Sequence, residues 1–168
     1  NYPMQIIGRS IGASLAMGNS CVLKPSEEAC LTALAFGEIS KEAGLPQGAL
    51  NIVPGYGIET GSYLASHPKI NHISFTGSCE TGSKVQEGAA KNVVPTTLEL
   101  GGKSPQIVFN DANVDKAIPF LINAGIQNAG QTCSASSRII VQEKIFDEVV
   151  YKMSARYKLL KAGPALKN

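Results

Sequence analysis

The stretch INHISFTGSCETGSKVQEGAAKNVVPTTLEL, residues 70–100, sets the pattern from which the fold can be predicted. Its first six residues alternate in polarity as a strand does, and a glycine-rich turn, TGSCETG, follows directly. Residues 80–91 then favour a helix, and TTLEL at 96–100 favours a second strand. This order is typical of two parallel strands joined by a crossover helix.

The same order recurs on both sides of this stretch. Further strands are expected at 21–24, 50–53, 105–109 and 137–142. Further helices are expected at 4–17, 27–43, 111–129 and 143–161. We therefore expect an α/β fold, with a Rossmann-like parallel sheet and crossover helices followed by the start of a second α/β domain. The glycine pair at 101–102 suggests a boundary between residues 1–101 and 102–168.

Two of the expected helices have an apolar face that predicts how they pack. The face of the first helix combines Ile7, Ile11, Ser14 and Leu15. The helix after the first strand is expected to begin behind Ser26 as its N-cap and to bury Leu31, Leu34, Ala35 and Ile39.

Composition and charge exclude several classes of function. The net charge is only +2, the basic residues are scattered and there is no Trp, which argues against binding to nucleic acid or to a membrane surface. The four cysteines show neither a CxxC pair nor a metal-binding spacing with histidine, so we expect reduced thiols, no metal site and an intracellular protein. No apolar run reaches about 18 residues and no signal peptide is visible. The expected location is the cytoplasm, with the mitochondrial matrix as the alternative.

The two ends of the sequence suggest an internal segment of a longer protein. The chain starts at Asn1, without an initiator Met and within a helical pattern, and it stops just after another helix.

Two glycine-rich turns are candidates for binding a pyrophosphate. They contain Gly55, Gly57 and Gly61 in the first and Gly77, Ser78 and Gly82 in the second. Each lies between a strand and a helix, where backbone N–H groups at the helix N-terminus favour an anion. Neither has the GxGxxG pattern, and a purely structural turn is an equally good interpretation of each.

A lysine and a glutamate lie where the first expected strand ends. Lys24 ends the strand and Glu27 opens the next helix, at the sheet edge where open parallel sheets bind ligands. An acidic residue there can hold ribose hydroxyls. A solvated lysine and a glutamate that favours the helix dipole are about as probable on local grounds.

Glu99 and Cys133 are the strongest candidates for chemistry. Glu99 lies between two leucines in TTLELGG, where a carboxylate is costly to bury unless it is hydrogen-bonded or neutral. Such a group suits a general base, whereas the alternative is a glutamate facing the sheet edge. Cys133 lies in NAGQTCSASS, residues 128–137, and both histidines, His67 and His72, are far upstream. The base that would activate this thiol is therefore not evident from the sequence around it.

Five short motifs occur in order along the chain. They are NYP at 1–3, VLKPSE at 22–27, FTGS at 75–78, LELGGKSP at 98–105 and GQTCSA at 130–135. Together they resemble the aldehyde dehydrogenase superfamily, in particular its NAD-dependent, non-acylating type. The resemblance covers the whole chain and corresponds to roughly the middle third of a typical member. It implies that residues 1–101 are part of the NAD-binding domain and that 102–168 begin the catalytic domain.

The resemblance also implies roles for individual residues. Cys133 matches the nucleophile, Asn1 the oxyanion-stabilising asparagine and Glu99 the general base that activates water. Residues implied in binding NAD are Lys24, Pro25, Ser26, Glu27, Gly57, Gly61, Phe75, Thr76, Gly77, Ser78, Gly82, Leu100 and Gly101. Glu27 would repel a 2′-phosphate and so favour NAD over NADP.

The implied function is oxidation of an aldehyde to a carboxylic acid with NAD. It would proceed through a thiohemiacetal and a thioester on Cys133, and the full-length protein is expected to be a homodimer or homotetramer. One alternative is the acylating type, which transfers the thioester to coenzyme A, but a hydrolytic base such as Glu99 argues against it. The other alternative is a catalytically incomplete remnant or a binding module.

Overall fold

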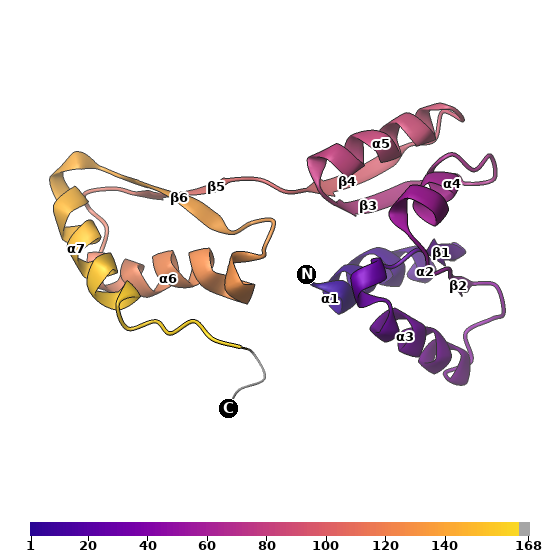
Figure 1. The fold of residues 1–168 in the computed structure, drawn as a ribbon, viewed down its shortest axis with the longest axis horizontal. Coiled ribbons are helices and arrows are strands. Elements are labelled where there is room, and N and C mark those ends of the chain that lie inside the picture. Colours follow the sequence, from indigo (N-terminus) through magenta and orange to yellow (C-terminus); the bar gives the residue numbers. More distant parts are fainter. Residues whose placement is uncertain (165–168) are drawn as a thin grey trace. The chain divides into compact units, whose positions relative to one another are not determined.

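The structure, a computed structural model that describes residues 1–164, confirms the expected α/β architecture. Within these residues the strands form three parallel pairs, each joined by its own crossover helix (Figure 1). The pairs are β1 (Cys21–Leu23) with β2 (Leu50–Ile52), β3 (Ile73–Gly77) with β4 (Thr96–Leu100), and β5 (Ser104–Val108) with β6 (Ser136–Val141). The crossover helices are α3 (Leu31–Glu42), α5 (Cys79–Ala90) and α6 (Val114–Ile126).

The remaining elements flank these pairs. A continuous helical run consists of α1 (Pro3–Ile7), the π-helical turn η1 (Gly8–Gly12) and α2 (Ala13–Ala16). Short helices in the first part of the chain are η2 (Glu27–Ala29), η3 (Gly57–Gly61) and α4 (Ser62–Ala65). The second part adds η4 (Gln127–Gly130), η5 (Glu143–Ile145) and α7 (Phe146–Tyr157).

The described chain forms two compact units. The first is Asn1–Leu100 and the second begins at Gly101. Their assignment to a coenzyme domain and a catalytic domain stays a prediction, and the last four residues of the predicted 102–168 domain lie outside the described residues.

The helical run at the start of the first unit packs as expected. Ile7 and Ile11 are each only 5% exposed and form a core cluster with Ala33 of α3, and Leu15 packs against it. The run ends at Gly18, whose φ of +79° is a conformation that favours glycine.

The predicted buried face of α3 is wrong. Leu31 is 79% exposed and Ile39 60% exposed, whereas Ala33 is fully buried. The helix approaches β2 through small residues instead, because a Cβ at Gly37 would lie 2.8 Å from Cδ1 of Ile52. Because the helix is apolar over much of its circumference, the positions of the large apolar side chains did not identify the face that is buried.

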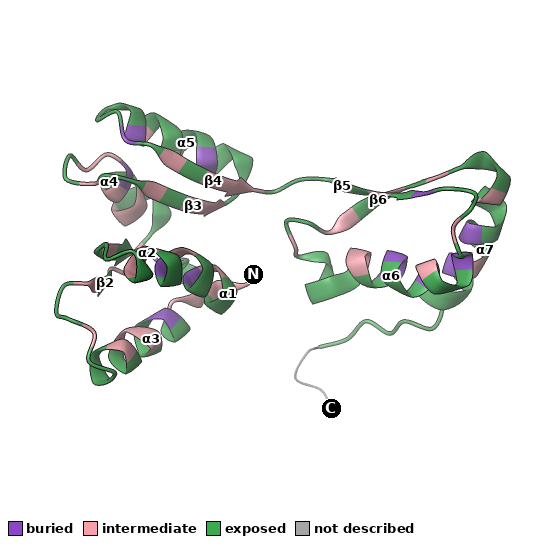
Figure 2. Ribbon diagram, turned by 180° about the vertical axis from the view of Figure 1, so that it is seen from behind, coloured by how far each residue is buried: buried purple, intermediate pink, exposed green. Residues whose placement is uncertain are grey.

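The second unit has a separate core between its strand pair and its two long helices (Figure 2). The buried residues are Val108, Val114, Ile118, Leu121, Ile122, Val149 and Met153. Lys152 of α7 also bonds to Asp115 of α6 at 2.6 Å and to Glu148 at 2.7 Å. These carboxylates, Asp115 first, raise the pKa of Lys152 above its usual value.

The contact between α4 and α5 gives a testable prediction for the fold. A Cβ at Gly88 would lie 3.1 Å from Cβ of Ala65 and 3.3 Å from its carbonyl carbon, which is backbone that cannot turn aside. We expect Gly88→Val to lower the free energy of unfolding of the full-length protein by about 1–3 kcal/mol, measured by urea denaturation. Gly88→Ala is the matched control and should cost less. A denaturation midpoint that is unchanged in both variants would contradict this packing.

Among residues 1–164, no helix combines the length and the apolar character needed to cross a membrane. The same part of the chain has no group of three or more His, Cys, Asp or Glu residues that could hold a metal ion.

Candidate active site

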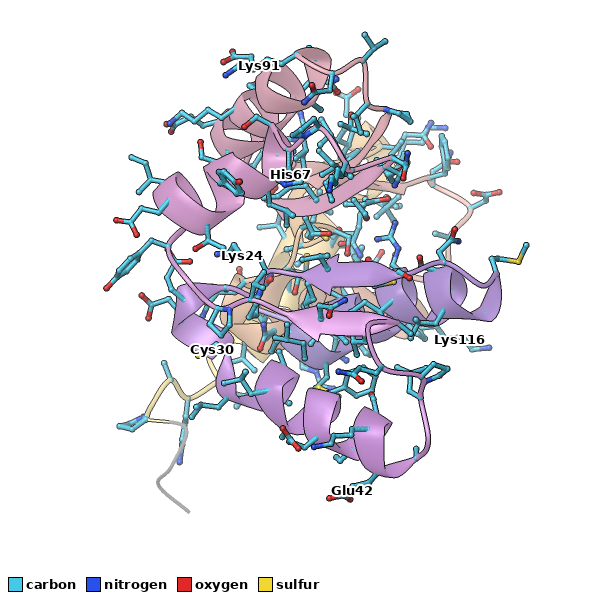
Figure 3. All side chains as sticks on the ribbon, turned by 90° about the vertical axis from the view of Figure 1, so that its right-hand side faces the viewer. Lys24, Cys30, Glu42, His67, Lys91 and Lys116 are labelled. Carbon is cyan, nitrogen blue, oxygen red and sulfur yellow. The ribbon has the colours of Figure 1, made fainter. Side chains whose placement is uncertain are left out.

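The first group of predicted coenzyme residues lies where β1 ends. Ser26 accepts a hydrogen bond from the backbone N–H of Glu28 at 3.3 Å and so caps η2, as predicted. This cap fixes the start of the short helix. Lys24, which is labelled in Figure 3, donates a hydrogen bond from Nζ to Oε2 of Glu27 at 3.2 Å. The Lys24 side chain is only 14% exposed, whereas that of Glu27 is 42% exposed. The carboxylate is thus held in place but accessible to a ligand.

The first glycine-rich turn contacts this pair. The pKa of Glu27 lies below its usual value, because its own backbone amide, the Lys24 ammonium group and the backbone of Gly57 all favour the carboxylate. A Cβ at Gly61 would lie 3.6 Å from Cδ of Lys24. The structure therefore brings Lys24, Glu27, Gly57 and Gly61 together, although they are up to 37 positions apart in the sequence. Pro25 and Ser26 lie in the connection between them.

The second glycine-rich turn joins β3 to α5. Ser78 is the N-cap of α5, and its hydroxyl accepts from the backbone N–H of Thr81 at 3.1 Å. Glycine at position 77 leaves room for the Phe75 ring, because a Cβ there would lie 2.5 Å from Cζ of that ring and the ring would have to move. Thr76 lies between these two residues, at the end of the strand. This turn thus presents the N-terminus of a 12-residue helix at the end of a strand.

Gly82 allows α5 to lie close to β4. A Cβ at this position would lie 2.7 Å from Cδ2 of Leu100, the residue paired with Gly77 across the strands. Leu100 therefore contacts the helix that follows the turn, and Gly101 is next along the chain.

Glu99 lies on β4 opposite Thr76. Its side chain is 45% exposed, which agrees with the alternative of a glutamate facing the sheet edge rather than with a buried carboxylate. It is not alone, however: the Arg9 guanidinium donates a hydrogen bond to Glu99 Oε1. Arg9 was missed by the sequence analysis, since it is 90 positions away in the chain and no motif points to it.

Cys133 is exposed and lies in a β-turn just before β6. The turn is closed by a hydrogen bond from the backbone N–H of Ala135 to the carbonyl of Thr132 at 3.0 Å. A Cβ at Gly102 would lie 3.9 Å from the carbonyl oxygen of Cys133, so the glycine pair is close to this turn within the second unit.

The segment that leads to Cys133 has an unusual backbone. The helix expected through residue 129 ends at Ile126, and Asn128, Ala129 and Gly130 follow with φ angles of +52°, +56° and +76°. For an alanine, this left-handed conformation costs about 1–2 kcal/mol. Three consecutive left-handed residues reverse the direction of the chain between α6 and the Cys133 turn.

Hydrogen bonds across this segment hold the left-handed turn. The backbone N–H of Gln131 donates to the carbonyl of Asn128 at 3.0 Å, and the Asn128 side-chain amide donates to the carbonyl of Gln131 at 3.3 Å. The Thr132 hydroxyl donates to the carbonyl of Gln127 at 3.2 Å. The position of Cys133 is therefore fixed by local bonds rather than by burial.

The other predicted catalytic residue, Asn1, is the first residue of the chain and lies two positions before α1. Of the remaining cysteines, Cys21 and Cys30 are half-buried and Cys79 is exposed as the first residue of α5.

A comparison with known families identifies the group to which this sequence is related. The model of the aldehyde dehydrogenase family matches residues 1–168. The chain belongs to the aldehyde dehydrogenase family. Betaine aldehyde dehydrogenase 1 of Oryza sativa subsp. japonica is 46% identical over 166 residues, which cover 99% of this chain and 33% of that protein. This member of the family thus spans about a third of the length of the curated relatives it matches.

Solved structures of aldehyde dehydrogenases have the same fold. A protein of this group from Burkholderia cenocepacia is 58% identical, with a TM-score of 0.91 over 93% of this chain and 33% of its own. Betaine aldehyde dehydrogenase from Staphylococcus aureus, solved in complex with NAD+, is 41% identical, with a TM-score of 0.93 over 96% of this chain and 32% of its own.

Proposed function

We propose that the full-length protein oxidises an aldehyde to a carboxylic acid with NAD+. The observation that carries the proposal is the exposed Cys133 thiol, held in a turn by local hydrogen bonds in a member of the aldehyde dehydrogenase family. NAD+, when bound, supplies the acceptor for a hydride.

The first unit has groups that fit NAD+. The Glu27 carboxylate, held by Lys24 and accessible, can accept hydrogen bonds from ribose hydroxyls. Backbone N–H groups at the start of α5, behind Ser78, favour the negative charge of a pyrophosphate. Together these groups support binding of the dinucleotide, through its ribose hydroxyls and its pyrophosphate.

Cys133 is assigned the attack on the aldehyde. Its sulfur, as the thiolate, forms a bond to the carbonyl carbon, the carbonyl π bond opens, and the oxygen takes up the negative charge. The side-chain amide of Asn1 and the backbone N–H of Cys133 are assigned to stabilise that oxygen. One such donor is typically worth about 3 kcal/mol. Loss of a hydride from the same carbon leaves a thioester on Cys133.

Glu99 is assigned the hydrolysis of the thioester. Its carboxylate accepts a proton from water, the water oxygen bonds to the thioester carbon, and the carbon–sulfur bond breaks to release the acid and the Cys133 thiolate. The accessible position of Glu99 on β4 supports this task, because water can reach it.

The test is NADH formation by the purified full-length protein with a series of aldehydes. We expect an increase in absorbance at the NADH wavelength with NAD+ and aldehyde alone, and no requirement for coenzyme A. Turnover that depends on coenzyme A would favour the acylating type instead. No NADH with any aldehyde would favour the catalytically incomplete remnant. A homodimer or homotetramer and a cytoplasmic location remain predictions.

Glu27 provides a prediction about the choice of coenzyme. We expect Glu27→Ser to reduce the ratio of kcat/KM for NAD+ over NADP+ by about tenfold or more, because a carboxylate repels a 2′-phosphate. Since its pKa is below the usual value, Glu27 is fully ionised above about pH 6. The ratio in the unsubstituted protein should therefore be constant between about pH 7 and 9. An unchanged ratio in the variant would mean that Glu27 only stabilises the start of η2.

A further inference from the structure

The second unit begins with an exposed connection that lies close to the Cys133 turn. Gly101, Gly102 and Lys103 are all exposed and directly precede β5. A Cβ at Gly102 would lie 3.9 Å from the carbonyl oxygen of Cys133. Because neither segment is buried, the burial of apolar surface does not hold one against the other. Their proximity therefore depends on polar contacts of the backbone.

A register shift between β5 and β6 lies beside this connection. Ser104 pairs with Ser136 in the regular way. The next pair joins Pro105 to Arg138, so Ser137 is an extra residue on β6. Such bulges are rare between parallel strands, and next to active sites they re-aim a side chain. The side chain that follows the extra residue here is that of Arg138.

The guanidinium group of Arg138 is directed back to the connection. Its Nε donates to the carbonyl oxygen of Lys103 at 3.0 Å, and its Nη2 donates to the same oxygen. Among residues 1–164, no carboxylate forms an ion pair with Arg138. Hydrogen bonds from a charged donor are roughly twice as strong as neutral ones. The cation therefore stabilises the backbone of the connection rather than another side chain.

The Cys133 turn has a different support on its upstream side. There the Asn128 amide donates to the carbonyl of Gln131, and the Thr132 hydroxyl donates to the carbonyl of Gln127. On the downstream side, Arg138 follows Cys133 by five positions and reaches the connection that lies near the turn. The two sets of bonds thus restrain the turn from both ends.

We propose that Arg138 is a positioning residue for the nucleophile. By binding the Lys103 carbonyl, it keeps the connection close to the Cys133 turn and so fixes the orientation of the Cys133 backbone. The N–H of Cys133 is assigned to stabilise the oxygen of the bound aldehyde, and a misplacement of about 1 Å can reduce a rate about 100-fold. This inference rests on the proposed oxidation of aldehydes and deepens it, because it names a residue that organises the same site.

The first test is hydrogen exchange in the full-length protein, which needs no turnover. The Ala135 amide reports on the Cys133 turn, because it donates to the carbonyl of Thr132 and closes the turn. We expect this amide to exchange about 3- to 10-fold faster in Arg138→Gln, since the turn would open more often. Arg138→Lys keeps a charged donor without the planar fork and should give an intermediate rate. Mass spectrometry with fragmentation to single residues measures these rates.

Two control variants test whether the effect is specific to this bond. Lys103→Gln changes the side chain but keeps the carbonyl that accepts from Arg138, so exchange at Ala135 should be unchanged. Gln142→Ala removes a similar bond at the other end of the same strands, where Gln142 Oε1 accepts from the backbone N–H of Asn110 at 2.7 Å. Exchange at Ala135 should be unchanged in this variant as well.

The second test is NADH formation with an aldehyde. We expect Arg138→Gln to reduce kcat by about 10- to 100-fold and to change KM for NAD+ by less than about twofold, because the assigned coenzyme groups belong to the first unit. Arg138→Lys should recover part of kcat. Gln142→Ala should retain it, whereas a general loss of stability would reduce turnover in both Arg138→Gln and Gln142→Ala.

The two tests separate this proposal from the proposed function. If no aldehyde is oxidised but exchange at Ala135 depends on Arg138, the positioning of the turn stands and the oxidation does not. If aldehydes are oxidised with the same kcat in Arg138→Gln, Arg138 is not a positioning residue. Exchange at Ala135 that is unchanged in Arg138→Gln, or that rises equally in Gln142→Ala, would also overturn the proposal. Should circular dichroism show Arg138→Gln to be unfolded, Arg138→Lys takes its place, and exchange and kcat equal to those of the unsubstituted protein would overturn it.

Discussion

Replacement of Cys133 by alanine is expected to abolish aldehyde oxidation in the full-length protein and to leave NAD+ binding nearly unchanged. The sulfur is the atom that would bond to the aldehyde carbon, and alanine offers no nucleophile in its place. We expect kcat to fall by about 10⁴-fold or more, measured as NADH formation. The coenzyme contacts assigned to Lys24 and Glu27 belong to the first unit, so the dissociation constant of NAD+ should change by less than about twofold.

Chemical labelling provides a control for the same residue. Cys133 is exposed, whereas Cys21 and Cys30 are half-buried. Cys21 lies in β1, and Cys30 directly precedes α3. A thiol reagent should therefore modify Cys133 before these two, as detected by mass spectrometry of peptides. Cys21→Ala is the matched variant and should retain oxidation. Normal turnover of Cys133→Ala would remove this cysteine from the mechanism.

Replacement of Glu99 by glutamine is expected to slow hydrolysis of the thioester much more than hydride transfer. Glutamine keeps the shape of the side chain but cannot accept a proton from water. We expect deacylation to slow by about 10²–10⁴-fold, the usual contribution of a general base. Rapid mixing should then show a burst of NADH, about one equivalent per active site, followed by a slow steady state.

The burst distinguishes two tasks for Glu99. If the burst rate and the steady state fall by the same factor, Glu99 acts before hydride transfer, for example by taking the proton of the Cys133 thiol. Arg9 is the hydrogen-bond partner of Glu99, so Arg9→Gln in the same experiment shows whether this bond affects the burst or the later phase. Glu143→Gln, at the start of η5 in the other unit, is a control that should behave like the unsubstituted protein.

Local sequence signals were sufficient for most of the elements. Alternation and turn residues predicted β4 at 96–100 with its observed bounds, and Ser26 was predicted as a helix cap from its residue type and position. These features depend on interactions within a few positions of the chain, such as the bond from the Glu28 N–H to the Ser26 hydroxyl. They therefore leave a signature that one sequence is enough to show.

Features that depend on distant contacts or rare backbone conformations were missed. In the sequence, the left-handed residues Asn128 and Ala129 follow directly on the helical pattern of α6, so a continued helix was predicted. Alanine as a residue type does not favour a positive φ and gave no sign of the turn. The ion-pair partner of Glu99 was also not predicted, because Arg9 is brought to it only by the tertiary structure. Sequence therefore located the candidate residues through family motifs but not the contacts that would govern their chemistry.

The three parallel strand pairs have a consequence for the way this chain is synthesised. The paired residues, such as Ile73 with Thr96, are separated by roughly 20–35 positions, which is little more than one crossover helix requires. Each pair can close when its own second strand has left the ribosome, without waiting for any later part of the chain. Since translation adds about 5–20 residues per second, the three modules would form in succession, a few seconds apart. Folding of this region should thus follow the N-to-C direction, and a ribosome-bound nascent chain in which Leu100 has just emerged from the exit tunnel should already protect the amides of β3 and β4 from hydrogen exchange.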